Sequence, residues 1–187
     1  IAVFTNFMPD HKNYYLSTLL ETGMQRYLAD KENIFKYQKP GDHLIRGETV
    51  KKLPKSWKLK ILGEHNRINA ACAVAVARVL EIPEKIIKKT VENFTGVSGR
   101  LELIRAWRGV KIYNDTTSTT PEATIVALRA LGVPRLRSGQ NQNIILILGG
   151  ADKNLEIKDE LIKTIQKYCK EIILLPGTGT EKLRRLL

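Results

Sequence analysis

The spacing of apolar residues divides the chain into two kinds of segment. Apolar residues three and four apart predict helices over residues 16–35, 70–80, 82–94, 121–131 and 157–168. Short apolar runs bounded by turn residues predict strands at 1–5, 44–45, 59–62, 101–104, 110–113, 144–148 and 172–175. The runs at 144–148 and 172–175 are apolar throughout, so we expect both of these strands to be fully buried.

The order of the segments changes near residues 95–99 (TGVSG). Beyond this point strands and helices alternate, which is typical of an α/β sheet with parallel strands. Sheets of this kind bind their ligands at the carboxyl ends of the strands. We therefore predict an α/β fold in two domains, residues 1–96 and 97–187, with functional side chains in the loops that follow the strands.

The composition is strongly basic, but the basic residues are spread along the chain. The formal net charge is +12 at pH 7, with 16 basic against 10 acidic residues in 1–95 and 15 against 9 in 96–187. Nucleic-acid-binding surfaces are usually more local and include aromatic residues for stacking. The densest basic run, 51–60, contains Trp57 but is broken by Pro54 and fits a solvated loop. Anionic small substrates are therefore better expected partners than nucleic acid.

The sequence also bears on the cellular compartment. Its longest apolar run is far too short to span a bilayer, and the first residues lack the pattern of a signal peptide. Cys72 and Cys169 lie in apolar patterns without metal-ligand spacing, as buried free thiols do in a reducing compartment. We expect a cytoplasmic protein without membrane insertion. Residue 1 is not Met and begins an apolar run, which suggests a piece of a longer protein.

Four polar clusters contain the candidate chemistry. They are TNFMPDH at 5–11 with Lys31 beyond it, GEHNRIN at 63–69, YNDTTSTTP at 113–121 and GGADK at 149–153. A His after a buried strand can bind a metal, but an isolated surface His is commoner, and Lys31 alone fits a solvated helix face. Asn66 and Asn69 share one helix face and either cap the helix or contact a base.

The last two clusters suggest anion binding. The hydroxyl-rich run at 113–121 lies where a helix begins, so it is either a helix cap or an anion site. The two glycines at 149–150 allow a ligand to approach the backbone closely. Lys153 beside them can neutralise a phosphate or a carboxylate.

Taken together, the four clusters resemble the Mur ligase family. TNFMPDH with a following YLADK, and GEHNRINAA, are similar to segments of the family's central domain. YNDTTSTTPEA and LILGGADK resemble the NDSKATN and LGGxxK segments of the members that add D-glutamate. The match covers nearly the whole chain. It implies that residues 1–96 are the remainder of a central ATPase domain and that residues 97–187 are a Rossmann-like carboxy-terminal ligase domain.

The resemblance implies roles for eight residues. His11 and Lys31, the latter as a carbamate formed with CO₂, would hold Mg²⁺, because a carbamate supplies the oxygens that this ion prefers. Three residues would take part in catalysis, namely Lys31, His11 and Lys153. Four would bind the nucleotide: Asn66 and Asn69 at the adenine, Arg100 at the phosphates and Asp115 at the ribose. Two would lie on the D-glutamate side, namely Thr119 and Lys153.

The resemblance also implies an activity. It predicts a monomeric, ATP- and Mg²⁺-dependent ligase of peptidoglycan synthesis, and hence of cell-wall biogenesis, cell shape and cell division. Such a ligase joins D-glutamate to UDP-N-acetylmuramoyl-L-alanine through an acyl phosphate. Two alternatives stay open: a folylpolyglutamate synthase-like ligase, which shares the fold and the acyl-phosphate chemistry, and a non-catalytic module that binds a nucleotide and an amino acid.

The chain departs from the family pattern in several places. Gly99 lies where a His often precedes the Arg, Thr117 replaces the Lys of NDSKATN, and the interval from His11 to Lys31 is longer than usual. No GTxGK[ST] phosphate-binding sequence occurs, and LPGTGTEK at 175–182 lacks its ending and fits a strand-to-helix loop. We therefore expect these 187 residues alone to fold without catalysing turnover.

Overall fold

The computed structural model describes residues 1–8, 10, 20–132 and 143–187. The chain clusters into two compact units, and each is described by itself. The first unit comprises the described residues up to Gly96, apart from Asp10. The second unit comprises Asp10 and the described residues from Val97 onward. Both units mix helices with two-stranded sheets, so the chain is a mixed α/β protein.

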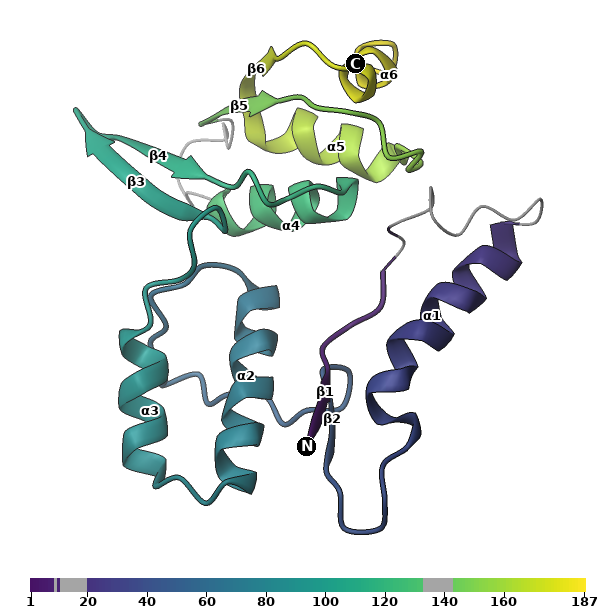
Figure 1. Ribbon diagram of the computed structural model, residues 1–187. Coiled ribbons are helices and arrows are strands. Elements are labelled where there is room, and N and C mark those ends of the chain that lie inside the picture. The colour runs from purple at the N-terminus through teal and green to yellow at the C-terminus, as the bar shows by residue number, and fades with distance from the viewer. Residues whose placement is uncertain (9, 11–19, 133–142) are drawn as a thin grey trace. The chain divides into compact units, whose positions relative to one another are not determined.

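The first unit combines a small parallel sheet with three helices (Figure 1). Strand β1 (Ala2–Phe4) pairs in parallel with β2 (Leu44–Arg46), and α1 (Leu20–Lys36) lies between them in the sequence. Helices α2 (Glu64–Val79) and α3 (Glu84–Asn93) follow. These bounds agree with the predicted segments, except that α2 begins earlier than residue 70. Residues 16–19 of the predicted first helix lie outside the described residues.

The predicted strand at 59–62 is wrong. Among the described residues, this segment joins no sheet. It runs along the end of α3 instead, where the Lys58 backbone N–H donates to the Glu92 carboxylate (3.0 Å) and the Lys60 ammonium donates to Asn93 Oδ1 (3.4 Å). Leu59 packs against the core of the unit. Leu59 is therefore explained by packing in the core of the unit, whereas Leu62 is exposed.

The core of the first unit lies between α2, α3 and the loop that precedes α2. Its buried members are Leu53, Trp57, Ala71, Val74 and Ile87. The guanidinium of Arg67 in α2 fixes the loop, because it donates to three backbone carbonyls at 53, 54 and 57. One α2 side chain thus holds the segment that contributes two core residues.

The second unit begins with a hairpin. Strand β3 (Glu102–Trp107) pairs antiparallel with β4 (Val110–Asn114), and the two turn residues Arg108 and Gly109 both have positive φ, 47° and 81°. A two-residue loop of this kind joins only antiparallel strands. Among the described strands, β3 and β4 form a sheet of their own. Among the described strands, the parallel sheet expected from the alternation of strands and helices therefore does not include β4.

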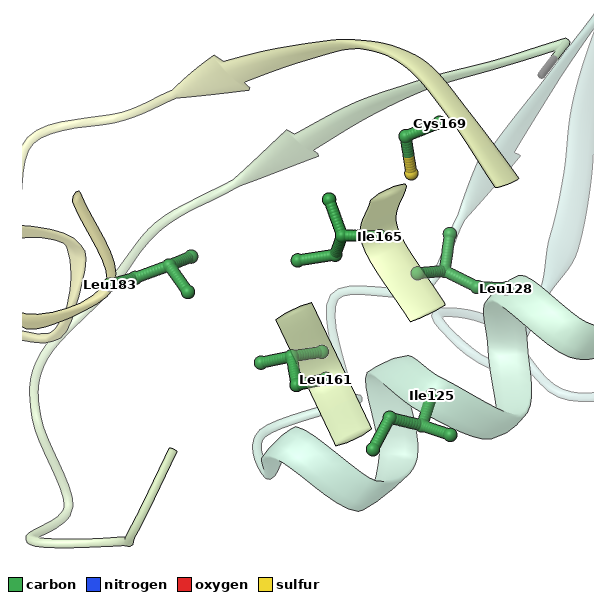
Figure 2. Packing of buried hydrophobic residues seen from close by; sticks show 6 residues of the cluster. All are labelled: Ile125, Leu128, Leu161, Ile165, Cys169 and Leu183. Carbon is green, nitrogen blue, oxygen red and sulfur yellow. The ribbon is translucent and has the colours of Figure 1, made fainter. Parts of the chain in front are cut away.

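The rest of the second unit is a parallel pair of strands with helices packed on one face (Figure 1). Strand β5 (Ile144–Leu148) pairs in parallel with β6 (Cys169–Leu174), as predicted. The helices are α4 (Pro121–Leu131), α5 (Asp159–Tyr168) and α6 (Thr178–Arg184). Their shared core, shown in Figure 2, contains Ile125, Leu128, Leu161, Ile165, Cys169 and Leu183.

Strands β5 and β6 are buried on one face only. Ile144, Leu146 and Leu148 of β5 pack against the helical core. The alternate residues are exposed, with Ile145 at 55% and Ile147 at 62%. The prediction that both strands are fully buried is therefore wrong, because the described helices cover a single face of the sheet. None of the described helices is long and apolar enough to cross a membrane.

Candidate functional site

Two loops that follow strands of the second unit meet through Thr119 and Lys153. Thr119 lies after β4, just before α4, whose first turn is fixed by Pro121 and by the Thr120 hydroxyl accepting from the Ala123 backbone N–H (3.2 Å). Lys153 lies after β5. Its ammonium donates to the Thr119 hydroxyl oxygen over 3.0 Å. The structure thus brings together the two residues that the resemblance assigned to the D-glutamate side.

The surroundings of Lys153 suit an anion-binding group. Its side chain is partly exposed, at 37%. The Asp10 carboxylate lies 3.4 Å from the same ammonium. A partly exposed lysine that contacts one hydroxyl and one carboxylate can exchange one of these contacts for the carboxylate of a ligand. The contact with Asp10 was not predicted.

The loops that follow β5 and β6 pack closely against each other, and Gly149 before Lys153 takes part in this packing. A Cβ added at Gly149 would lie 2.7 Å from the Leu175 Cβ, and one added at Gly177 would lie 2.3 Å from the Gly150 carbonyl oxygen. The loops after β5 and β6 therefore touch backbone to backbone. The sequence-based interpretation was that the two glycines admit a ligand. At Gly149 the close neighbour is Leu175, whereas the space next to Gly150 is open.

Arg100 and Asp115, two predicted nucleotide-binding residues, belong to one local hydrogen-bond network in the second unit. Asp115 Oδ1 accepts from the Leu101 backbone N–H (2.9 Å), and Oδ2 accepts from the Ser118 hydroxyl. The Arg100 guanidinium donates to the Thr117 carbonyl oxygen (3.2 Å). Both carboxylate oxygens of Asp115 thus orient local structure, and each has a further lone pair available to a ligand.

Gly99 and Thr117, two of the departures from the family pattern, contact each other within this hydrogen-bond network. The Thr117 backbone N–H and hydroxyl both donate to the Gly99 carbonyl oxygen. Gly99 has φ of +74°, and a Cβ at this position would lie 2.9 Å from the Thr117 Cγ2. The absence of a side chain at residue 99 and the short side chain at residue 117 are therefore sterically linked.

Sequence reasoning missed Glu102, whose carboxylate accepts three hydrogen bonds in the same network. Its Oε2 accepts from the Gly99 backbone N–H (2.9 Å), the Ser98 hydroxyl (2.9 Å) and the Asn114 amide (3.3 Å). These donors, the Gly99 N–H foremost, lower the pKa of the Glu102 carboxyl. An acidic residue three positions after Gly99 was the available signal, but the sequence does not show which backbone and side-chain donors point toward its carboxylate.

Asn66 and Asn69 lie near the start of α2 in the first unit. The Asn66 amide donates to the Leu62 carbonyl oxygen (2.7 Å), which ties the first turn of the helix to the preceding loop. Asn69, three residues on, is exposed. Gly63 occupies the N-cap position and makes no side-chain cap bond. Asn66 is therefore not the N-cap residue of α2, and its amide donates to a carbonyl that precedes the helix. The amide keeps further hydrogen-bonding capacity.

The proposed metal ligands are only partly described. His11 lies outside the described residues. Lys31 is exposed on α1, with its ammonium 5.0 Å from the centre of the Tyr27 ring, a cation–π contact. In the described part of the chain, no group of three or more His, Cys, Asp or Glu residues is arranged to hold a metal. Lys31 as described is an ammonium stacked on an aromatic ring, and we assign it no step through a metal.

Both cysteines are free and buried, as predicted. Burial raises the pKa of the Cys72 thiol and raises that of Cys169 to about 11. The nucleophilic form of a cysteine is the thiolate, which is scarce when the pKa is this high. Neither thiol therefore belongs to the candidate site.

Comparison with known proteins gives a consistent result. No family model matches the chain. A UDP-N-acetylmuramoylalanine–D-glutamate ligase of a Roseiflexus species is 31% identical over the whole chain and 47% of its own length. The protein of the same name from Caldanaerobacter subterraneus is 38% identical over 72% of the chain and 28% of its own length. That from Acetivibrio thermocellus is 28% identical over the whole chain and 45% of its own length. The chain spans about half the length of the curated relatives that it matches end to end.

Proposed function

The chain is homologous to a segment of the UDP-N-acetylmuramoylalanine–D-glutamate ligases, and we propose that it provides part of the nucleotide site and the amino-acid site of such a ligase. One structural observation carries the proposal. Lys153 and Thr119, chosen from the sequence as amino-acid-binding residues, are in hydrogen-bond contact although they belong to different loops. In this proposal the first unit is the remainder of the central ATPase domain and the second is the Rossmann-like ligase domain.

The proposed reaction of the whole enzyme has two steps. A carboxylate oxygen of UDP-N-acetylmuramoyl-L-alanine attacks the γ-phosphorus of ATP, which gives an acyl phosphate and ADP. The amine of D-glutamate then attacks the acyl carbon, loses a proton, and phosphate leaves from the tetrahedral intermediate. Negative charge accumulates in both steps, so stabilisation by fixed cations is the main catalytic requirement.

Lys153 and Thr119 fit the second step. An ammonium and a hydroxyl 3.0 Å apart can hold one carboxylate of the incoming amino acid between them. Fixing that carboxylate orients the amine toward the acyl carbon, and such orientation supplies a large part of the acceleration in bimolecular reactions. Lys153 would also offset the charge of the amino acid as it approaches the acyl phosphate.

The nucleotide roles remain part of the proposal. Asn66 and Asn69 would contact the adenine, and Asp115 the ribose. The exposed guanidinium of Arg100 would reach the phosphates. The hydrogen bonds that Asp115 makes to Leu101 and Ser118 support this assignment only in that they fix the orientation of its carboxylate. Mg²⁺ enters the proposal through the family resemblance alone, with His11 and carbamylated Lys31 as its ligands.

We further propose that these 187 residues bind ligands without turning them over. The sequence contains no GTxGK[ST] segment, whose backbone N–H groups and lysine cradle the phosphates of a nucleotide. The non-catalytic binding module therefore describes the chain in isolation, while ligation describes the longer enzyme. Phosphate release by the chain alone, dependent on both D-glutamate and the muramoyl substrate, would contradict this proposal.

The test is a titration of the isotope-labelled chain with D-glutamate, followed by NMR. We expect the backbone signals of Thr119 and of residues 152–154 to shift with D-glutamate. L-Glutamate serves as the stereochemical control and should give smaller shifts at the same concentration. If Lys153→Ala responds to D-glutamate as strongly as the unchanged chain does, the assignment of the amino-acid site is wrong.

A further inference from the structure

The loop that presents Lys153 is tied to helix α6 on both sides of the lysine. On the amino-terminal side, the Asp152 backbone N–H donates to the Thr178 hydroxyl oxygen over 2.9 Å. On the carboxy-terminal side, the Lys182 ammonium donates to the Leu155 carbonyl oxygen over 2.7 Å. The same ammonium lies 3.6 Å from the Asp152 carboxylate. Lys153 therefore projects from a short span of backbone that is held at both ends by one helix.

Helix α6 is itself fixed, so it can act as the support. Thr178 and Lys182 are four residues apart and share one face of the helix. Leu183 is only 3% exposed and belongs to the helical core shown in Figure 2. The Gly179 backbone N–H also donates to the Gly150 carbonyl oxygen (3.0 Å). A shift of α6 would thus disturb the core and the start of the loop together.

The loop between the two ties has a defined shape. The Asn154 backbone N–H donates to Asp152 Oδ1 (2.9 Å), and Asn154 adopts φ of +56°. Asp152 Oδ2 faces Lys182, so one carboxylate orders the turn and meets the supporting lysine. Leu155, which follows, is 7% exposed. The backbone on either side of Lys153 is therefore specified by hydrogen bonds and burial.

We propose that Thr178 and Lys182 are positioning residues for the amino-acid site. They act through the loop, fixing the backbone of Lys153 so that its ammonium stays beside the Thr119 hydroxyl. A lysine has a long and flexible stem, so its aim depends on how firmly its backbone is held. Lys182 is engaged by Leu155 and Asp152 and supports the loop, while Lys153 meets the ligand. This inference rests on the proposed function for the identity of the ligand, and on the contacts alone for the support.

The first experiment measures the support without any ligand. Amide hydrogen exchange, read residue by residue by NMR in the 187-residue chain, reports on the Asp152 and Asn154 backbone N–H groups. Thr178→Val and Lys182→Met should speed their exchange about two- to tenfold, the factor expected when one hydrogen bond is lost. Thr178→Ser and Lys182→Arg keep the donor or acceptor and should restore slow exchange. Unchanged exchange in Thr178→Val and Lys182→Met would overturn the proposal.

The second experiment measures the consequence for binding with D-glutamate as the probe. Lys182→Met should weaken D-glutamate binding about tenfold, because a displaced Lys153 would lose its own charge-assisted hydrogen bond to the ligand, and Lys182→Arg should rescue binding. Lys163→Met, at an exposed lysine of α5, removes the same charge away from the loop and should leave binding unchanged. Equal weakening in Lys163→Met would show a general charge effect and overturn the positioning role.

The two experiments separate the two proposals. If the unchanged chain and Lys153→Ala both fail to respond to D-glutamate, the proposed function is wrong, and the exchange rates still decide whether α6 supports the loop. If the unchanged chain binds D-glutamate and Lys182→Met binds it equally well, the proposed function stands and the positioning role is refuted.

Discussion

The ammonium of Lys153 lies 3.0 Å from the hydroxyl oxygen of Thr119, although the two residues are 34 positions apart. The contact arises because Thr119 follows β4 and precedes α4, while Lys153 follows β5 in the same unit. Neither side chain alone distinguishes an anion site from a solvated surface. Their pairing places an ammonium and a hydroxyl at one partly exposed point, and the proposed amino-acid site rests on this arrangement.

The first prediction concerns this pair in the longer ligase that the proposed function implies. Lys153→Ala should abolish D-glutamate ligation while leaving adenine-nucleotide binding nearly intact, because in the proposed function the Lys153 ammonium holds the amino acid and does not contact the nucleotide. Thr119→Val, which removes one hydroxyl, should weaken D-glutamate binding about two- to tenfold. Thr119→Ser keeps the hydroxyl and is the matched control. Steady-state ligation with D-glutamate as the varied substrate checks all three, and unchanged turnover in Lys153→Ala would mean that its role is misassigned.

The second prediction concerns the steric link between Gly99 and Thr117. Gly99→Ala should destabilise the chain by about 1–3 kcal/mol through its left-handed backbone, and further through the contact with the Thr117 Cγ2. Gly109→Ala is the matched control, since Gly109 has φ of +81° and open space around it. Urea unfolding of both variants measures the difference, which we assign to the clash.

A double-mutant cycle isolates that clash. Thr117→Ser removes the Cγ2 methyl and keeps the hydroxyl that bonds the Gly99 carbonyl. In the Thr117→Ser background, Gly99→Ala should lower the free energy of unfolding by no more than Gly109→Ala does. A cost of Gly99→Ala that is the same with and without the Thr117→Ser substitution would contradict the link between the two positions.

The third prediction concerns Arg67 in the first unit. Arg67→Met should destabilise this unit by about 1.5–3 kcal/mol, because it leaves three carbonyl oxygens without their charged donor. Arg67→Lys should recover only part of the loss, since an ammonium cannot reproduce the fork of a guanidinium. Trp57 is 6% exposed in the held loop, so its fluorescence reports the effect once the exposed Trp107 is replaced by Phe.

The control for Arg67 is Arg78→Met in α2. Arg78 pairs with Glu84 at the surface, with side chains 41% and 55% exposed. Exposed pairs of this kind contribute about 1 kcal/mol or less. If Arg67→Met and Arg78→Met lower the free energy of unfolding by the same amount, the loop is held by its apolar contacts and the hydrogen bonds of Arg67 are dispensable.

The periodicity of the sequence predicted most elements, and it did so best where local start signals exist. Helix α4 has the bounds expected from Thr120-Pro121, a cap followed by a residue that suits the first helical turn. Strand β5 also has the predicted bounds. The strand expected at 59–62 failed because an apolar residue such as Leu59 has the same sequence pattern whether its partner is a strand or a helix.

Burial and hydrogen-bond partners were harder to predict, because they depend on what lies across from a residue. The alternating exposure of β5 follows from helices on a single face of the sheet, and a run of five apolar residues does not encode this. Thr119 and Lys153 were placed together by the family resemblance, which assigned both to the D-glutamate side. The contacts of Glu102 and Lys182 could not be predicted, since each has a backbone group among its partners and the direction of that group is set by the folded chain.

The last prediction concerns the dependence of stability on pH through Glu102. Its carboxyl pKa is lowered in the folded chain, by the Gly99 N–H first and then by the Ser98 hydroxyl. A carboxyl of this kind contributes stability that is fully present above its unfolded pKa and is lost as the pH falls through its folded pKa. Since an unperturbed Glu has a pKa of about 4.3, the loss should begin near that pH and continue below it.

Glu102→Gln tests this by removing the titrating group while keeping an oxygen that can accept from the Gly99 N–H. We expect the variant to be less stable than the unchanged chain at pH 7 and to lose less stability between neutral and acidic pH, as measured by urea unfolding at each pH. Glu181→Gln, at an exposed carboxylate of α6 that pairs with Arg184, is the matched control and should leave the pH profile nearly unchanged. A profile for Glu102→Gln that runs parallel to that of the unchanged chain would show that the acid sensitivity arises from other carboxylates. The charge of Glu102 would then contribute little to stability, and the hydrogen-bond network around Gly99 would be stabilised mainly by the two bonds from Thr117.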